Sequence, residues 1–309
     1  MKKFVCLALS LMTVLAMFTG CGSKTDTPAA TTEDTANQDT ASQDTAAEDA
    51  AAEDNAAEET NGAAESLSGT VNTDGSTSMN EMMLIMMEVF EELNPDVTVN
   101  YSGTGSGAGI EAVLNETVDI GLASRALKDE EKSNGAVEHI VALDGVAVVV
   151  NPENTVADLT VDQIAQIYKG EVTNWSELGG ADQEIAVLGR EDGSGTRSAF
   201  EEIVGVDGEC KYTNEYSSTG DVIGQVASNP GAIGYASLSA VDETVTAVKV
   251  DGVAPSEETV KDGSYTLQRP FVMVTKDGVE LSAAAQGFLD FVMSDEAAQY
   301  ITMAGVVAP

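Results

Sequence analysis

The sequence repeats one local pattern: an apolar strand, a short loop of glycine and hydroxyl residues, and the start of a helix. Three such loops stand at Gly75–Ser78, Gly103–Gly109 and Gly193–Thr196. Strands and helices that alternate in this way indicate an α/β protein with mostly parallel sheets. The apolar run Gly145–Val150 is typical of a strand buried on both faces. The pattern extends over about 240 residues, which predicts two such lobes.

The first residues form a different kind of segment. Lys2 and Lys3 precede an apolar run, Phe4–Phe18, which is typical of a secretory signal and is too short for a membrane-spanning helix. The ending Phe18-Thr19-Gly20-Cys21 resembles a bacterial lipobox, with Phe18 where Leu is usual. We therefore predict a signal peptide at residues 1–20 and lipid (palmitate) modification of Cys21. The alternative is an ordinary cleaved signal with an incidental cysteine.

The segment after Cys21 lacks the residues that build a core. Residues 22–66 contain no Val, Ile, Leu or aromatic residue, and they hold 12 acidic residues and one Lys. Such a composition cannot bury enough apolar surface to fold. We predict that residues 21–66 are a disordered acidic tether that links a lipidated Cys21 to the folded part.

Charge and composition exclude several functions. The formal net charge is −38, with 14 Lys and Arg against 52 Asp and Glu, so a nucleic-acid partner is not expected. His139 is the only histidine, which excludes metal sites that need two. Of the three cysteines, Cys6 leaves with the signal and Cys21 takes the lipid. Cys210 is left alone, so no internal disulfide is expected.

The three loops share the chemistry of an anion site. Glycines allow close backbone approach, helix N-termini present free N–H groups, and Ser and Thr add hydroxyl donors. Helix capping alone is the alternative, since caps select the same residues. No nucleotide motif fits, because Gly195 is followed by Thr196 and Arg197 without a P-loop lysine. The loops therefore indicate a site for a bare oxyanion.

Taken in order, six segments resemble the phosphate-binding proteins of bacterial high-affinity phosphate ABC transporters. They are Gly75-Ser76-Thr77-Ser78, Gly105-Ser106-Gly107, Ile120-Gly121-Leu122-Ala123-Ser124-Arg125, Ile167-Tyr168-Lys169-Gly170 with Thr173-Asn174-Trp175, Arg190-Glu191-Asp192-Gly193-Ser194-Gly195-Thr196-Arg197, and Asn229-Pro230-Gly231-Ala232-Ile233-Gly234-Tyr235. The resemblance covers essentially all of residues 67–309. It implies a two-lobed periplasmic-binding-protein (Venus-flytrap) fold with a hinge, one phosphate between the lobes, no cofactor or metal, and no catalytic activity.

The resemblance also implies the ligand residues. Carried over position by position, they are Thr77, Ser78, Ser106, Ser124, Arg190, Ser194, Gly195 and Thr196. An arginine can bind two phosphate oxygens with its fork of N–H groups, and hydroxyls and loop amides complete the donors. Arg190 has a second interpretation, pairing with Glu191 or Asp192. Arg197 is equally consistent with a ligand contact and with an ion pair to Glu201 at i,i+4.

One position departs from the family. Some members place an Asp directly after the Ser of the Ile120–Arg125 motif, where it accepts the phosphate proton, but Ser124 is here followed by Arg125. A carboxylate in that role rejects sulfate, which has no proton to donate. We assign the role of proton acceptor to Asp144 as a hypothesis, with Asp192 as second choice.

The sequence thus predicts a monomeric, lipid-anchored solute-binding protein on the extracytoplasmic face of the cell membrane. It would capture inorganic phosphate and deliver it to the membrane subunits of an ABC permease. Residues 67–150 with 237–309 would form lobe I, and 151–236 lobe II. The alternatives are a binding protein for sulfate or molybdate, a phosphate sensor or adhesin on the same fold, and an enzyme acting on phosphate esters. An enzyme of this kind would need an activated nucleophile or a metal cluster, and the sequence indicates neither.

Overall fold

A computed structural model describes residues 66–309. The predicted signal peptide (1–20), Cys21 and the predicted tether up to residue 65 lie outside the described residues.

Strands and helices alternate along the described chain. The strands are β1 (Gly69–Gly75), β2 (Val97–Ser102), β3 (Ile120–Ala123), β4 (Ala136–Val150), β5 (Asp158–Leu159), β6 (Ala186–Arg190), β7 (Asn214–Tyr216), β8 (Ala232–Ser237), β9 (Thr246–Ala247), β10 (Lys249–Val250) and β11 (Gln268–Lys276). The α-helices are α1 (Asn80–Leu93), α2 (Ser106–Leu114), α3 (Asp129–Ser133), α4 (Val161–Tyr168), α5 (Gly195–Val204), α6 (Thr219–Ser228), α7 (Glu257–Lys261), α8 (Ala283–Val292) and α9 (Ala298–Met303). Three 3₁₀ helices complete the set: η1 (Thr77–Met79), η2 (Trp175–Leu178) and η3 (Leu238–Ala240).

Nine of the strands form one mixed sheet in the order β2-β1-β3-β11-β4-β8-β6-β7, with β9 paired to β4. Pairing is parallel at both ends, where β1 joins β2 and β3 and where β6 joins β7 and β8. It is antiparallel in the middle, where β11 joins β3 and β4 and where β4 joins β8. The predicted α/β class is confirmed. The sheets were predicted to be mostly parallel, whereas this sheet is mixed, with its antiparallel pairs concentrated at the centre.

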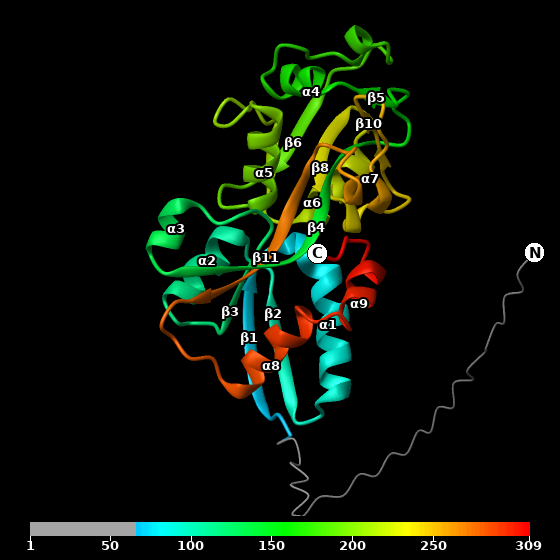
Figure 1. The fold of residues 1–309 in the computed structure, drawn as a ribbon. Coiled ribbons are helices and arrows are strands. Elements are labelled where there is room, and N and C mark those ends of the chain that lie inside the picture. The colour runs from blue at the N-terminus through cyan, green and yellow to red at the C-terminus, as the bar shows by residue number, and fades with distance from the viewer. Residues whose placement is uncertain (1–65) are drawn as a thin grey trace, which may run out of the picture. The chain divides into compact units, whose positions relative to one another are not determined.

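Strand β4 changes partner part of the way along its length. Its first part pairs with β11 up to Gly145, and its last five residues pair with β8. Strand β11 begins at this point, with Gln268 opposite Gly145 and Arg269 opposite Asp144. Figure 1 shows β4 and β11 running side by side between two groups of helices. These two strands therefore connect the two halves of the sheet.

The half of the sheet before this crossing has helices on both faces. One core cluster joins α1, α8 and α9 to the strands through residues such as Met82, Met86, Phe288 and Ile301. Met79 and Met83 also lie in this cluster. A second cluster joins α2 to the other face, with Ile110 packed beside residues of β11.

The half after the crossing is built in the same way. One cluster gathers α4, α5 and Trp175, and another packs α6 against the opposite face. Val248, Val250, Val260, Tyr265 and Leu267 also lie in the first of these clusters. The segment from Val248 to Leu267 thus contributes to the core of the second half. The predicted lobe I, 67–150 with 237–309, includes this segment.

Two helices begin inside the glycine-rich loops. Helix α2 starts at Ser106 and α5 at Gly195. The glycine-rich loops themselves form the first turns, because small residues allow the helix end to approach its neighbours closely. Helix α6, which follows Ser218, was not predicted.

Gly109 marks such a close approach and gives a test of it. A Cβ at this position would lie 2.3 Å from the carbonyl oxygen of Asp74 and 2.6 Å from Cα of Gly75. We expect Gly109→Ala to lower the free energy of unfolding by about 1–3 kcal/mol, because α2 must move away from β1. Urea denaturation measures this change.

The matched control is Gly224→Ala in α6, where an added Cβ meets no atom within 4 Å. It should leave stability unchanged or raise it by up to about 1 kcal/mol. Equal stability of the two variants would contradict the tight contact of α2 with β1.

Candidate functional site

Hydroxyl groups from both halves of the sheet meet where its helices begin. Ser78 Oγ, in η1, lies 2.7 Å from Thr196 Oγ1 in α5 and 2.9 Å from Thr219 Oγ1 in α6. Ser106 Oγ, at the start of α2, lies 3.2 Å from Ser124 Oγ after β3. Ser124 Oγ is 3.5 Å from Thr196 Oγ1. These five buried residues are called the hydroxyl cluster below.

Glycines allow the loops around the cluster to touch. The N–H of Gly107 donates to the carbonyl of Gly193 at 2.9 Å, which joins the start of α2 to the loop before α5. A Cβ on Gly195 would lie 2.3 Å from Ser106 Oγ. Any side chain at 195 would therefore push the two loops apart.

Arg190 is a buried cation without a carboxylate partner among residues 66–309. Arg190 is the last residue of β6, and the whole residue is 2% exposed. No ion pair within residues 66–309 includes it. The guanidinium donates to Thr219 Oγ1 at 3.1 Å and to the carbonyls of Tyr216 and Ser217 at 3.1 and 2.6 Å. Burial lowers its pKa to about 10, so Arg190 remains charged at neutral pH. The predicted pairing with Glu191 or Asp192 does not form.

The backbone of Arg190 is held from two sides. Its N–H donates to the hydroxyl of Tyr235 at 3.0 Å, and its carbonyl accepts from Nη1 of Arg197 at 3.0 Å. Arg197 in turn pairs with Glu201 at 2.9 Å and with Glu215 at 2.8 Å. Of the two interpretations left open for Arg197, the i,i+4 ion pair with Glu201 is confirmed.

A second buried arginine lies at the strand crossing. Arg269 pairs with Asp144 on the neighbouring strand, with Nη2 2.9 Å from Oδ2. Its Nη1 donates both to the carbonyl of Ser124 at 2.7 Å and to Thr196 Oγ1 at 2.8 Å. Burial raises the pKa of Asp144 and lowers that of Arg269, while their attraction opposes both shifts. Arg269 thus contacts residues from both halves of the sheet.

Capping explains some of the predicted ligand residues and not others. Ser194 does cap α5, because its Oγ accepts from the N–H of Arg197 at 3.3 Å. Ser106 lies inside the first turn of α2, and its Oγ accepts from the N–H of Ser124 at 3.1 Å. Thr77 is not a cap either, and its Oγ1 accepts from the N–H of Thr219 at 3.3 Å. Ser106 and Thr77 therefore join loops that are distant in sequence.

The candidate proton acceptors lie in different surroundings. Both oxygens of Asp144 are occupied, Oδ1 by the hydroxyl of Ser237 at 2.8 Å and Oδ2 by Arg269. Asp192 is exposed. Arg125 turns away from the hydroxyl cluster and forms a two-pronged pair with Glu131 at 2.8 and 2.7 Å.

Sequence reasoning missed Thr219 and Arg269. Thr219 had a detectable signal, because Ser217-Ser218-Thr219-Gly220 repeats the composition of the three loops that were recognised. Arg269 had none, since a single arginine at the start of an apolar strand does not reveal that Asp144 lies opposite it.

Two openings lie next to the hydroxyl cluster. A small cavity of about 70 Å³ is lined by Arg190, Ser194 and Ser217 on one side and by Thr104 and Gly105 on the other. A wider groove of about 820 Å³ borders Thr77, Ser78 and Thr219. The donors of the cluster are therefore near solvent although they are themselves buried.

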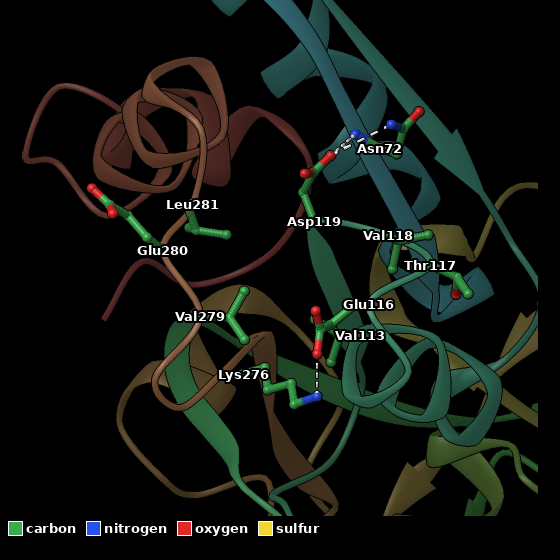
Figure 2. A pocket seen from close by; sticks show the side chains of 10 residues that line it. All are labelled: Asn72, Val113, Glu116, Thr117, Val118, Asp119, Lys276, Val279, Glu280 and Leu281. Carbon is green, nitrogen blue, oxygen red and sulfur yellow. Dashed lines mark hydrogen bonds and ion pairs between the residues drawn. The ribbon is translucent and has the colours of Figure 1, made fainter.

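Another pocket, of about 270 Å³, shares no residue with the cluster and has a different character (Figure 2). Glu116, Asp119 and Glu280 line it, and its lysine, Lys276, points to Glu116 with Nζ 2.5 Å from Oε1. Asp119 accepts from the backbone N–H of Asn72 at 2.7 Å. Such an acidic pocket does not suit an anion.

Two further properties concern residues 66–309 alone. No group of three or more His, Cys, Asp or Glu side chains in this range is placed to hold a metal ion. No helix in the same range is long and apolar enough to cross a membrane.

Comparison with known proteins finds one family and relatives that share one name. The family described as PBP superfamily domain matches residues 57–296. The phosphate-binding protein PstS of Bacillus subtilis (strain 168) is 35% identical over 237 residues, which cover 75% of this chain and 78% of that protein. The protein of the same name from Borreliella burgdorferi is 28% identical over 72% of this chain and 84% of its own.

Solved structures give the same result. A putative phosphate ABC transporter substrate-binding protein from Clostridium perfringens, solved with bound phosphate, is 41% identical with a TM-score of 0.76. The match covers 78% of this chain and 100% of that one. An ABC-type phosphate transport receptor from Vibrio cholerae is 33% identical with a TM-score of 0.65, over 77% of this chain and 100% of that one.

The Asp144–Arg269 pair gives a stability test. We expect Asp144→Asn to lower the free energy of unfolding by about 3–5 kcal/mol, because it leaves Arg269 charged, buried and unpaired. The double variant Asp144→Asn with Arg269→Met should recover much of that loss, because no uncompensated charge remains. Urea denaturation of the three proteins gives the values. A double variant no more stable than the single one would show that the pair does not determine stability here.

Proposed function

We propose that this chain, which belongs to the PBP superfamily and within it to the bacterial phosphate-binding proteins named PstS, captures inorganic phosphate between two lobes. It then delivers the phosphate to the membrane subunits of an ABC permease. The names of the relatives support the transport part of this proposal, because these relatives are named as phosphate-binding or phosphate ABC transporter proteins.

The single observation that supports phosphate as ligand is the burial of Arg190 without a carboxylate partner in the described part of the chain. A buried charge is costly unless an opposite charge compensates it. Thr219, which accepts a hydrogen bond from Arg190, stands at the N-terminus of α6, where free N–H groups also favour an anion. A bound phosphate would supply the missing negative charge.

The ligand residues that we propose are the predicted ones without Asp144 and with Thr219 added. They are Thr77, Ser78, Ser106, Ser124, Arg190, Ser194, Gly195, Thr196 and Thr219. Hydroxyls that now bond to one another would turn to the phosphate oxygens, and the amides of the loop at Gly195 would add donors. Asp144 is in this proposal a positioning residue for Arg269, because Arg269 and Ser237 already occupy its oxygens.

We place the lobe boundary at the crossing of β4 and β11. Lobe I would consist of residues 66–145 and 268–309, and lobe II of 146–267, which follows the packing of the core clusters. Two connecting strands allow a hinge motion that opens and closes the site. Donors from both lobes would then close on the same anion.

The protein would act without cofactor or catalysis, since its relatives are named as binding proteins. We also propose that it is a monomer. We further propose that lipidated Cys21 anchors it on the extracytoplasmic face of the cell membrane, with residues 21–66 as a tether. The sequence Lys2 to Cys21 supports this anchor.

Substitution of Arg190 tests the ligand role. We expect Arg190→Gln to weaken phosphate binding about 100-fold or more, which corresponds to about 3 kcal/mol, because charge-assisted hydrogen bonds are lost. Arg190→Lys should bind with intermediate affinity, since it keeps the charge but not the fork. Isothermal titration with phosphate measures both, and parallel titrations with sulfate and molybdate rank the anions.

Lys276→Gln is the matched control, because it removes a cation from the acidic pocket away from the cluster. It should bind phosphate like the unaltered protein. Unchanged phosphate affinity in Arg190→Gln would overturn the proposed site.

The lipid anchor has its own test. Cys21→Ser should release the protein from the membrane fraction of expressing cells, because no acyl chain can be attached. Mass spectrometry of the mature N-terminus identifies the lipid directly. Cys210→Ser is the control and should remain membrane-bound. Membrane association of Cys21→Ser equal to that of the control would refute lipidation at this residue.

A further inference from the structure

A chain of hydrogen bonds runs through the hydroxyl cluster from one buried arginine to the other. Arg269 Nη1 lies 2.8 Å from Thr196 Oγ1, and Thr196 Oγ1 lies 2.7 Å from Ser78 Oγ. Ser78 Oγ lies 2.9 Å from Thr219 Oγ1, which is 3.1 Å from Arg190 Nη1. Ser78 therefore stands between two threonines, and each threonine contacts an arginine.

The arginines fix the direction of these bonds. A guanidinium has N–H donors and no acceptor, so Thr196 and Thr219 must accept from Arg269 and Arg190. Each threonine hydroxyl has one hydrogen, which must then point away from its arginine. The available neighbours lie inside the cluster: Ser78 for both, Ser124 at 3.5 Å from Thr196, and Thr77 at 3.3 Å from Thr219.

The cluster also lacks a free carboxylate. Asp144 accepts from Ser237 and from Arg269. Arg125, next to Ser124, is turned toward Glu131. The two arginines and the hydroxyls of Thr196 and Thr219, which already accept from them, can therefore meet a bound anion as hydrogen-bond donors.

We infer that Arg269, acting through Thr196, and Arg190, acting through Thr219, hold the hydroxyl hydrogens toward the anion and so select tetrahedral anions by their protonation. The inference rests on the proposed function of the same site. Arg269 is a positioning residue in this scheme. A phosphate dianion can turn its one hydroxyl toward the opening beside Arg190, whereas the monoanion has two hydroxyls to place. A proton-free dianion such as sulfate meets no unpaired acceptor.

Titrations with phosphate and sulfate between about pH 6 and pH 8 test the selection, since phosphate groups lose their second proton near this range. Phosphate affinity should rise with pH in proportion to the dianion, and sulfate affinity should stay level. Sulfate should bind within about 100-fold of phosphate. A site built around an acceptor for the phosphate proton would instead reject sulfate by about 10⁴-fold or more.

Sulfate also controls for titration of the protein, because it does not change protonation in this range. The charged groups that face the cluster or its openings are Arg190, Arg269, Asp144, Asp74, Glu81, Glu191, Asp192, Arg197, Asp221 and Asp242. His139 contacts Thr275 and lines another pocket. A change in the protonation of any of these groups would alter the pH dependence of sulfate affinity.

The double variant Asp144→Asn with Arg269→Gln tests the positioning role, because an amide can accept as well as donate and leaves no unpaired charge. We expect the ratio of sulfate to phosphate affinity at about pH 6 to fall about tenfold. Thr196→Ser keeps a hydroxyl and should keep the ratio, whereas Thr196→Val should lower the affinity for both anions.

The matched control is Glu116→Gln with Lys276→Gln, which neutralises the ion pair in the pocket of Figure 2 and should change neither anion. Phosphate affinity independent of pH, or sulfate rejected by about 10⁴-fold, would overturn the inference and leave the proposed function intact. Failure of both anions to bind would overturn the proposed function itself.

Discussion

Arg190 and Arg269 are both buried beside the hydroxyl cluster, and within residues 66–309 only Arg269 of the two has a carboxylate partner, Asp144. The arrangement around the site depends on this imbalance of charge. Asp144 compensates Arg269, which leaves Arg190 with carbonyl and hydroxyl partners only. The helices that begin at the cluster add the positive ends of their dipoles. An anion bound at the proposed site would compensate this buried positive charge.

The strand crossing explains why the Asp144–Arg269 pair can serve both halves of the sheet. Asp144 and Arg269 stand opposite each other on β4 and β11, next to the point where β4 changes its partner. From there Arg269 reaches the carbonyl of Ser124 on one side and Thr196 on the other. A motion of the two halves about these strands would alter the Arg269–Thr196 contact directly. The proposed closure of the site would therefore change the geometry of the proposed donors.

The sequence predicted those parts of the structure that depend on local chemistry. Strand and helix patterns gave the α/β class, and the loops around Ser78, Ser106 and Thr196 could be recognised because glycine and hydroxyl residues mark helix starts that bind anions. Arg269 could not be found in this way, because its role depends on a residue 125 positions away on a neighbouring strand. The lobe boundary that we propose depends on long-range packing in the same way, since Val248 and Leu267 are placed by the core cluster in which they lie.

The net charge of the whole chain repels an anion, whereas the buried arginines of the proposed site attract one. With a formal net charge of −38, the long-range field repels an anion, and salt screens that field over about 10 Å. Capture must then depend on donors within hydrogen-bond distance, whose buried position limits screening. This explains why the donors are arginines and hydroxyls held by several partners each. Hydrogen bonds from positioned donors can hold an anion, whereas the long-range field of this acidic protein repels it.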